Sequence, residues 1–151
     1  MVDPTGKREL YTFIDYSGSV AVVASDRRGT VLIEEWNYPT HRWLWGLPSG
    51  GRQRGSSPLA EARRELFEET GLKAKHWRRL AALQESPGLT NDIKYIFLAE
   101  QLNGKLIPQT AEAIRAVKFF SWRQVQAMMR RGQVATAGSV VGLLLAERRT
   151  K

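Results

Sequence analysis

The chain of 151 residues contains no cysteine and only two histidines. Without cysteine, disulfide bonds, thiolate metal sites and cysteine nucleophiles are excluded. The chain also lacks a long apolar run: its longest small and apolar stretch, residues 135–146, is interrupted by Thr136 and Ser139 and is shorter than the roughly 20 residues that a membrane-spanning helix needs. Residues 1–8 show no apolar stretch behind their charges, so we expect no signal peptide. These absences predict a cytoplasmic protein that enters no membrane.

Acidic residues are fewer than basic ones, 15 against 23, and the formal net charge is +8. Such a balance suits an anionic partner, which could be a nucleotide, a nucleic acid or a lipid surface. A solvated basic surface explains it equally well, because the basic residues are scattered in pairs such as Arg27-Arg28 and Arg130-Arg131. The hydrophobic fraction of 42% is ordinary for a globular protein. We expect one domain, residues 1–151.

Several segments carry clear secondary-structure signals. Residues 19–25 and 30–35 are β-branched and apolar, and the turn 26–29 between them predicts a hairpin. Residues 38–55 hold two prolines and four glycines and are expected to be mostly loop. Further signals predict strands at 93–99 and 117–120 and helices at 121–132 and 137–148. This order predicts an α+β fold, a mixed β-sheet flanked by helices.

The best-marked helix covers residues 58–70. Ser57 is a plausible N-cap, Pro58 suits the first helical position, and Gly71 stands where a left-handed cap belongs. In a helix each residue is rotated by about 100° from the one before. This rotation places all four glutamates of the segment on the arc opposite the apolar side: Glu61, Glu65, Glu68 and Glu69. Like charges three and four apart repel one another. The stripe is therefore either a solvated acidic face or a set of ligands for a divalent cation, which prefers oxygen donors.

The segment 50–72 resembles the signature box of the Nudix hydrolases. In that family a glycine is followed after five residues by a glutamate and, after seven more, by Arg-Glu-apolar-x-Glu-Glu-x-Gly-apolar. The positions that stand in register are Gly50, Arg64, Glu65, Leu66, Glu68, Glu69, Gly71 and Leu72. Ser56 stands where the family has its first glutamate, a residue that in family members mainly supports the box.

The resemblance implies the Nudix fold, an α/β/α sandwich, and hydrolysis of a pyrophosphate bond with Mg²⁺ or Mn²⁺. It implies that Glu65, Glu68 and Glu69 bind metal, with Glu68 also catalytic. It implies that Arg64 orients a neighbouring glutamate. Divalent ions neutralise a diphosphate and activate the attacking water, so the chemistry is consistent with these residues.

The resemblance extends beyond the box. Residues 20–38 and 45–50 look like the Nudix branch that cleaves ADP-ribose and related nucleoside diphosphate sugars, and Pro87 fits a proline that lies beyond the box in this branch. The branch implies a homodimer and a catalytic glutamate in the loop before a late strand, for which Glu112 is the candidate. An ordinary exposed glutamate remains the alternative. Two positions depart from the branch: Asn37 replaces a common arginine and Gly46 a common glutamate.

The residues expected to contact the substrate are Trp36, Tyr38, Ser49, Gly50 and Pro87. The aromatic pair could stack on a base, although each is also suited to ordinary packing. Two functions follow. The first is a metal-dependent hydrolase that releases a nucleoside monophosphate from ADP-ribose or another nucleotide sugar. The alternative is a low-activity or inactive Nudix-fold module that binds a nucleotide or RNA, which the departures at Ser56 and Asn37 favour.

Overall fold

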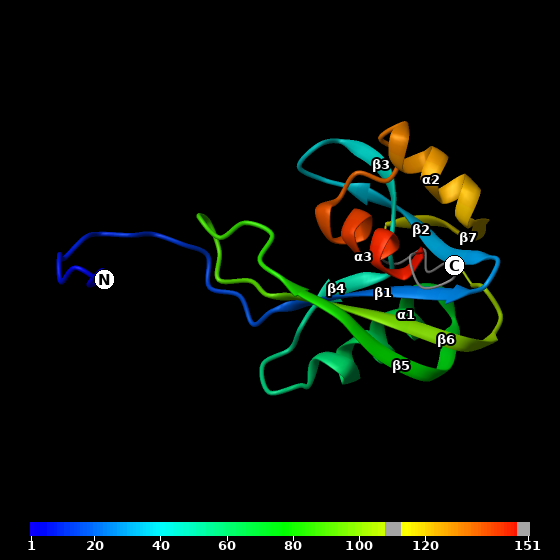
Figure 1. The fold of residues 1–151 in the computed structure, drawn as a ribbon, viewed down its shortest axis with the longest axis horizontal. Helices are drawn as coiled ribbons and strands as arrows, with labels where there is room; N and C mark the ends of the chain where they lie inside the picture. The colour runs from blue at the N-terminus through cyan, green and yellow to red at the C-terminus, as the bar shows by residue number, and fades with distance from the viewer. Residues whose placement is uncertain (108–112, 148–151) are drawn as a thin grey trace.

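The computed structural model describes residues 1–107 and 113–147. Within them the chain forms seven strands and three helices (Figure 1). Their bounds are β1 Ser19–Asp26, β2 Gly29–Asn37, β3 Arg42–Gly46, β4 Ser49–Gly51, α1 Pro58–Thr70, β5 Leu72–Leu83, β6 Lys94–Gly104, β7 Ile114–Ser121, α2 Trp122–Arg130 and α3 Ala137–Glu147. In the described ranges no helix combines the length and the hydropathy that crossing a membrane requires.

The strands make a mixed sheet in the order β3-β2-β1-β6-β5, with β4 beside β1 and β7 beside β2. β1 runs parallel to β6, and the other pairs are antiparallel. Both faces of β1 are buried: Val20 and Val22 belong to one apolar cluster, Ala21 and Val23 to the other. Because successive side chains of a strand point to opposite faces, a continuous apolar run is what a strand covered on both sides requires.

Helices cover the two faces of the sheet. Ala62 and Leu66 of α1 join the cluster that contains Val20 and Val22. Val125 of α2 and Leu143 of α3 join the opposite cluster. In Figure 1, α1 is partly hidden by β1 and β6, while α3 lies beside β1. The α/β/α arrangement expected from the sequence is confirmed.

The predicted hairpin is correct at its turn and incomplete beyond it. β1 and β2 pair only at Ser25↔Thr30 and Asp26↔Gly29. Past these pairs β1 continues alongside β6, while β2 continues between β3 and β7. Because β2 diverges, the first residues of β1 have a free edge, and β4 pairs with that edge, for example at Val20↔Gly50. The signature glycine is thereby held in a strand, next to the sheet centre.

Three strands were not predicted. Residues 38–55 are mostly loop, as expected, but they also contain β3 and β4, which pair with β2 and β1. The long strand β5 was not predicted. Its exposed and half-buried positions show no strong alternation, and it is a strand because it pairs with β6 along nearly its whole length. Each of these strands is defined by its pairing with another strand, which its own composition does not indicate.

A substitution in α1 tests how the helix is attached to the sheet. Leu66 has no exposed surface, whereas the neighbouring Phe67 is 48% exposed. Leu66→Ala is expected to lower the free energy of unfolding by about 2–5 kcal/mol, because it removes buried methyl groups and leaves a cavity. Urea denaturation measures the change. Phe67→Ala is the matched control, and a loss for Phe67→Ala equal to that for Leu66→Ala would contradict the assignment of the buried face.

Candidate active site

Local signals at both ends make α1 a well-defined platform for its charged side chains. The Ser57 hydroxyl accepts a hydrogen bond from the Ala60 amide at 3.2 Å, and Pro58 occupies the first turn. At the other end Gly71 adopts φ 75°, and its amide donates to the Phe67 carbonyl at 2.8 Å. Only glycine adopts this left-handed conformation readily. The expected start and end of the helix are both confirmed.

The glutamates of α1 are not a solvated acidic face. Glu61, Glu65 and Glu69 are buried, with 3%, 6% and 3% of their surface exposed. The side chain of Glu68 retains 42% exposure. The arc that carries them faces β4 and the loop before the helix, through contacts with Gly50, Ser49 and Gln53. Since burying a charged carboxylate is costly unless it is paired, the partners of these groups are central to the site.

Arg64 lies at the centre of the glutamate cluster. Its Nε donates to Oε2 of Glu61 at 2.8 Å, its Nη2 donates to Oε1 of Glu65, and its Nη1 donates to Oε2 of Glu68. Desolvation acts to lower the pKa of Arg64, but the hydrogen bond to Glu61 and the charges of its neighbours raise it overall. The planar guanidinium presents its donors in a fixed fork. One side chain thus holds three carboxylates that would otherwise repel each other.

Strand β4 contacts the same carboxylates from the other side. The amide of Ser49 donates to Oε2 of Glu69 at 2.8 Å. Gly50 lies so close to Glu65 that a Cβ on Gly50 would be 2.0 Å from Oε1. No side chain can occupy that space without displacing the carboxylate. The glycine of the signature box is therefore required for its close approach to Glu65, a reason that the sequence did not reveal.

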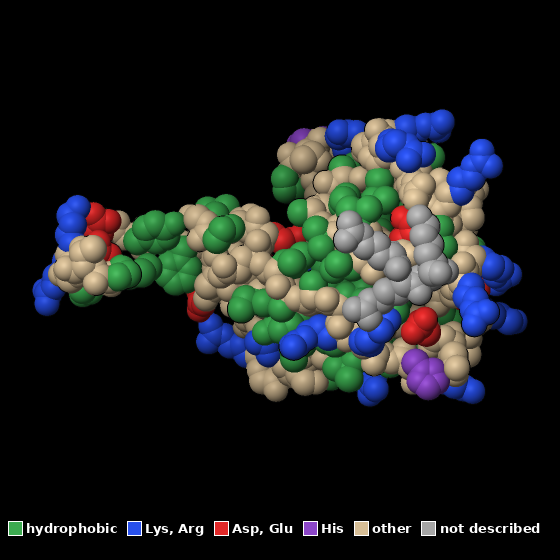
Figure 2. Space-filling model, in the orientation of Figure 1, with side chains coloured by type: hydrophobic (Ala, Val, Ile, Leu, Met, Phe, Trp, Pro, Cys, Tyr) green, Lys and Arg blue, Asp and Glu red, His purple; other side chains and the backbone are tan. Residues whose placement is uncertain are grey.

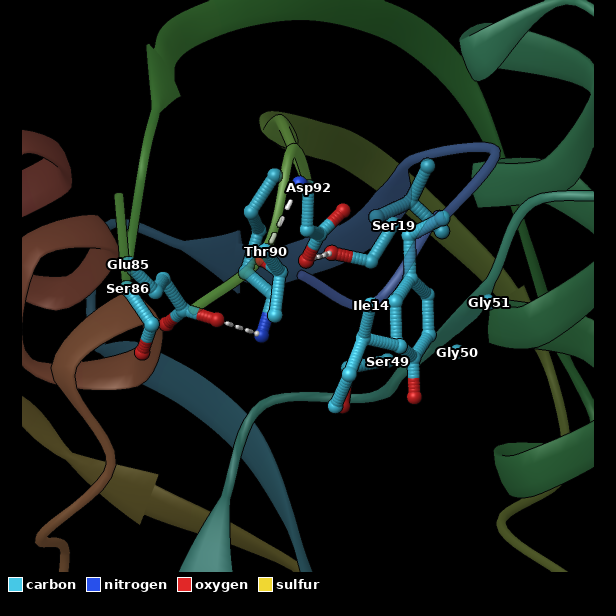
Figure 3. Close-up of a pocket in the computed structure, with 12 residues that line it drawn as sticks. Ile14, Ser19, Ser49, Gly50, Gly51, Glu85, Ser86, Thr90 and Asp92 are labelled. Carbon is cyan, nitrogen blue, oxygen red and sulfur yellow. Dashed lines mark hydrogen bonds and ion pairs between the residues drawn. The ribbon is translucent and has the colours of Figure 1, made fainter. Parts of the chain in front are cut away.

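A cavity of about 370 Å³ is lined in part by the residues of β4. We call it the β4 pocket; its lining is Ile14, Tyr16, Ser19, Val20, Ser49, Gly50, Gly51, Glu85, Ser86, Thr90, Asp92 and Lys94. Figure 3 shows Ser19 and Asp92 facing each other across a hydrogen bond of 2.8 Å from the serine hydroxyl to Oδ2. The other carboxylate oxygen of Asp92 is buried and accepts no hydrogen bond from any described residue. Lys94 and Glu85 form an ion pair at 2.5 Å.

The expected substrate-contacting residues fall into two groups. Ser49 and Gly50 line the β4 pocket, and Pro87 lies in the β5–β6 loop directly after the lining residue Ser86. Trp36 instead packs edge-on against Trp43, with ring centroids 5.4 Å apart. Tyr38 is 68% exposed beyond the end of β2. Neither aromatic residue lines the β4 pocket.

Glu112, the expected base, lies outside the described residues. Residues that sequence reasoning did not assign also belong to this region, chiefly Glu61, Ser19 and Asp92. Glu61 had a detectable signal, since it shares the glutamate arc of α1. Ser19 and Asp92 had none, because only the strand pairing of β1 with β6 places the end of the preceding loop next to Ser19.

The donor set of α1 fits a hard divalent cation. Within residues 1–107 and 113–147, no three Asp, Glu or His side chains are arranged so that they could hold a metal ion together. Glu65 and Glu68 nevertheless offer carboxylate oxygens close to each other, because both accept from the same guanidinium. A carboxylate has about four lone-pair positions, so a hydrogen bond from Arg64 leaves acceptor capacity for a cation. Glu65, Glu68 and Glu69 are therefore the candidate ligands.

Comparison with known proteins identifies the family. Residues 15–138 match the NUDIX domain, and the chain belongs to the NUDIX domain family. It is 35% identical over 101 residues to an ADP-ribose pyrophosphatase of Bacillus subtilis (strain 168), an alignment that covers 66% of this chain and 55% of that protein. It is 29% identical over 135 residues to an ADP-ribose pyrophosphatase of Mycobacterium tuberculosis (strain ATCC 25618 / H37Rv), covering 87% and 65%. The matches thus span only 55% and 65% of these two relatives.

A solved structure confirms the fold. The crystal structure of ADP compounds hydrolase superposes with a TM-score of 0.82 at 21% sequence identity, covering 98% of this chain and 81% of that one. The expectation of a Nudix fold, made from the signature segment, is confirmed by this likeness and by the family match.

Proposed function

We propose that this protein, acting as a single domain, hydrolyses a pyrophosphate linkage in a nucleoside diphosphate derivative and releases a nucleoside monophosphate. The substrate we propose is ADP-ribose or another nucleotide sugar. Divalent metal, Mg²⁺ or Mn²⁺, is required. The observation that carries the proposal is the contact between Gly50 and the Glu65 carboxylate. It joins the first and central parts of the signature box beside a cavity large enough for a small ligand.

The proposed roles follow from the contacts. Glu65, Glu68 and Glu69 hold the cation, which supplies charge neutralisation to the diphosphate when bound. Arg64 keeps Glu65 and Glu68 oriented through its two terminal nitrogens. The Ser49 amide fixes one oxygen of Glu69. Glu68 is the catalytic carboxylate because it has the greatest access to solvent among these glutamates, and Glu112 remains the proposed base.

The β4 pocket supports a nucleotide-linked substrate. Its floor is the strand that touches Glu65 and Glu69, so a ligand in the pocket lies next to the candidate metal site. Asp92 offers a buried carboxylate oxygen that can accept a hydrogen bond from a sugar hydroxyl. The two curated relatives named as ADP-ribose pyrophosphatases support the choice of sugar. Pro87, Trp36 and Tyr38 remain proposed contacts at the edges of this region.

The surface gives less support to the nucleic-acid alternative. Figure 2 shows lysine and arginine side chains on several parts of the visible face, along its edges and across its lower part, rather than gathered over one groove. A protein that binds RNA mainly through phosphates generally concentrates its positive charge on one face or along one stripe. A homodimer and a cytoplasmic location stay predictions.

A substrate panel tests the proposed function. We expect release of nucleoside monophosphate from ADP-ribose or a related nucleotide sugar in the presence of Mg²⁺ or Mn²⁺, and none with excess EDTA. The panel includes dinucleotides, nucleoside diphosphates and RNA carrying a 5′-triphosphate, each analysed by chromatography of the products. Preferred release of pyrophosphate from the RNA would overturn the substrate assignment. The absence of metal-dependent turnover on every compound would overturn the hydrolase assignment.

A further inference from the structure

Ser56 departs from the family pattern, which has a glutamate at this position. In the family the glutamate at this position mainly supports the box, and a serine carries no charge to do so. Here the Ser56 hydroxyl donates to the Gln53 carbonyl at 2.9 Å, and the Ser56 carbonyl accepts from Nη1 of Arg52 at 2.6 Å. Ser56 therefore stabilises the loop before α1. It offers no carboxylate to Arg64.

Glu61 supplies a carboxylate at the same place from a different part of the chain. It lies in the first turn of α1, five residues after Ser56, and is only 3% exposed. One of its oxygens accepts from Nε of Arg64 at 2.8 Å, and the other accepts from the Gln53 amide at 3.4 Å. The carboxylate thus joins the loop that contains Ser56 to the guanidinium at the centre of the site.

The surroundings of Glu61 favour the charged form of its carboxylate. The pKa of the Glu61 carboxyl is lowered: the nearby Ser56 hydroxyl has the largest effect, desolvation opposes it, and Arg64 lowers the pKa further. A buried carboxylate without such partners would be strongly unfavourable. Oε2 of Glu61 lies 2.8 Å from both Nε and Nη2 of Arg64. With this edge of the guanidinium held by Glu61, Nη2 also reaches Glu65 and Nη1 reaches Glu68.

We infer that Glu61 is a positioning residue that replaces, from the helix, the supporting carboxylate which the family carries at position 56. The inference rests on the proposed function for its effect on turnover. Glu61 holds the Nε edge of Arg64, and Arg64 in turn holds Glu65 and Glu68 at the candidate metal site. Glu61 thus supplies, from the helix, a carboxylate that position 56 of this chain does not carry.

Moving the carboxylate back tests the inference. Glu61→Ala is expected to lower kcat about 100-fold with little change in KM, since small misplacements of a catalytic group have effects of that size. Ser56→Glu combined with Glu61→Ala is expected to recover at least about a tenth of the wild-type kcat, because the inference predicts that a carboxylate at position 56 accepts from the vacated Nε of Arg64. Glu61→Gln retains the volume and serves if the alanine variant does not fold. Glu100→Ala, at an exposed position of β6, is the control for removal of a carboxylate.

A binding measurement separates this inference from the proposed function. The dissociation constant of Mn²⁺, measured by electron paramagnetic resonance of the free ion, is expected to rise about tenfold in Glu61→Ala and to return toward wild type in the double variant. Wild-type protein without turnover but with this pattern of Mn²⁺ binding would refute the hydrolase and leave the inference supported. Active protein whose kcat and Mn²⁺ affinity are unchanged by Glu61→Ala and Glu61→Gln would refute the inference alone. Losses that the double variant does not rescue would also refute it, because they would reflect burial rather than the position of the carboxylate.

Discussion

Glu68→Gln is expected to reduce kcat at least about 1,000-fold, which corresponds to about 4 kcal/mol of lost transition-state stabilisation. Glu68 is the glutamate of the signature box with the greatest access to solvent, and Arg64 already orients one of its oxygens. Glutamine keeps the volume and a carbonyl oxygen that accepts from Arg64, so the fold should be retained. Only the negative charge that a cation needs is removed. Steady-state kinetics on the best substrate of the panel measures the change.

Thermal unfolding and a control variant complete this test. Glu100→Gln makes the same chemical change at an exposed position of β6 and should leave kcat within about twofold, as expected for a substitution away from the site. Retention of wild-type turnover by folded Glu68→Gln would rule out a catalytic role for this carboxylate. A simultaneous drop in melting temperature and activity would instead indicate that Glu68 matters for stability.

Gly50→Ala is expected to lower kcat about 100-fold while leaving the protein folded. The added Cβ would lie 2.0 Å from Oε1 and 2.3 Å from Cδ of Glu65, distances that no structure tolerates. Because the obstructing group is the end of a flexible side chain, the carboxylate can move away at little cost in stability. The movement breaks its hydrogen bond with Nη2 of Arg64 and displaces a proposed metal ligand.

The next residue along β4 offers a matched control. A Cβ at Gly51 meets nothing within 4 Å, so Gly51→Ala should retain activity within about threefold. Both variants change glycine to alanine in the same short strand, so general effects of the substitution cancel. The comparison requires kcat and the melting temperature of each variant. Equal activities for the two would show that the close approach of Gly50 to Glu65 has no role in turnover.

These contacts change how the departures from the family are interpreted. Ser56 favoured a module with weak or no activity when the sequence was considered alone. In the structure, Glu61 brings a carboxylate to Arg64 and to the loop of Gln53, so the support for the box is retained from another position. The departure at Ser56 therefore no longer favours the inactive alternative.

Much of the catalytic helix was predictable because its signals are local. A cap at Ser57, a proline at the first position and a glycine at Gly71 act within one or two turns of the chain. The spacing of the box residues likewise lies within one segment, which is why the fold class and the candidate metal ligands could be named in advance. The apolar run of β1 indicated a strand for the same reason, since its side chains alternate over consecutive positions.

The remainder depended on contacts between distant segments. Strand β4 forms because β1 and β2 diverge and leave an edge of β1 free, which local composition cannot indicate. The β4 pocket exists because the parallel pairing of β1 with β6 brings Asp92 to Ser19, 73 positions apart in sequence.

The sequence by itself determined α1, the identity of its box residues and the class of fold, because helix capping, side-chain periodicity and motif spacing are short-range properties. The tertiary structure decided which of the glutamates are buried, that Gly50 must be small, and that Glu61 contacts both Arg64 and Gln53. Those facts follow from where β4 and the preceding loop pack against α1. Packing depends on pairs of segments, whereas a local pattern describes only one segment at a time.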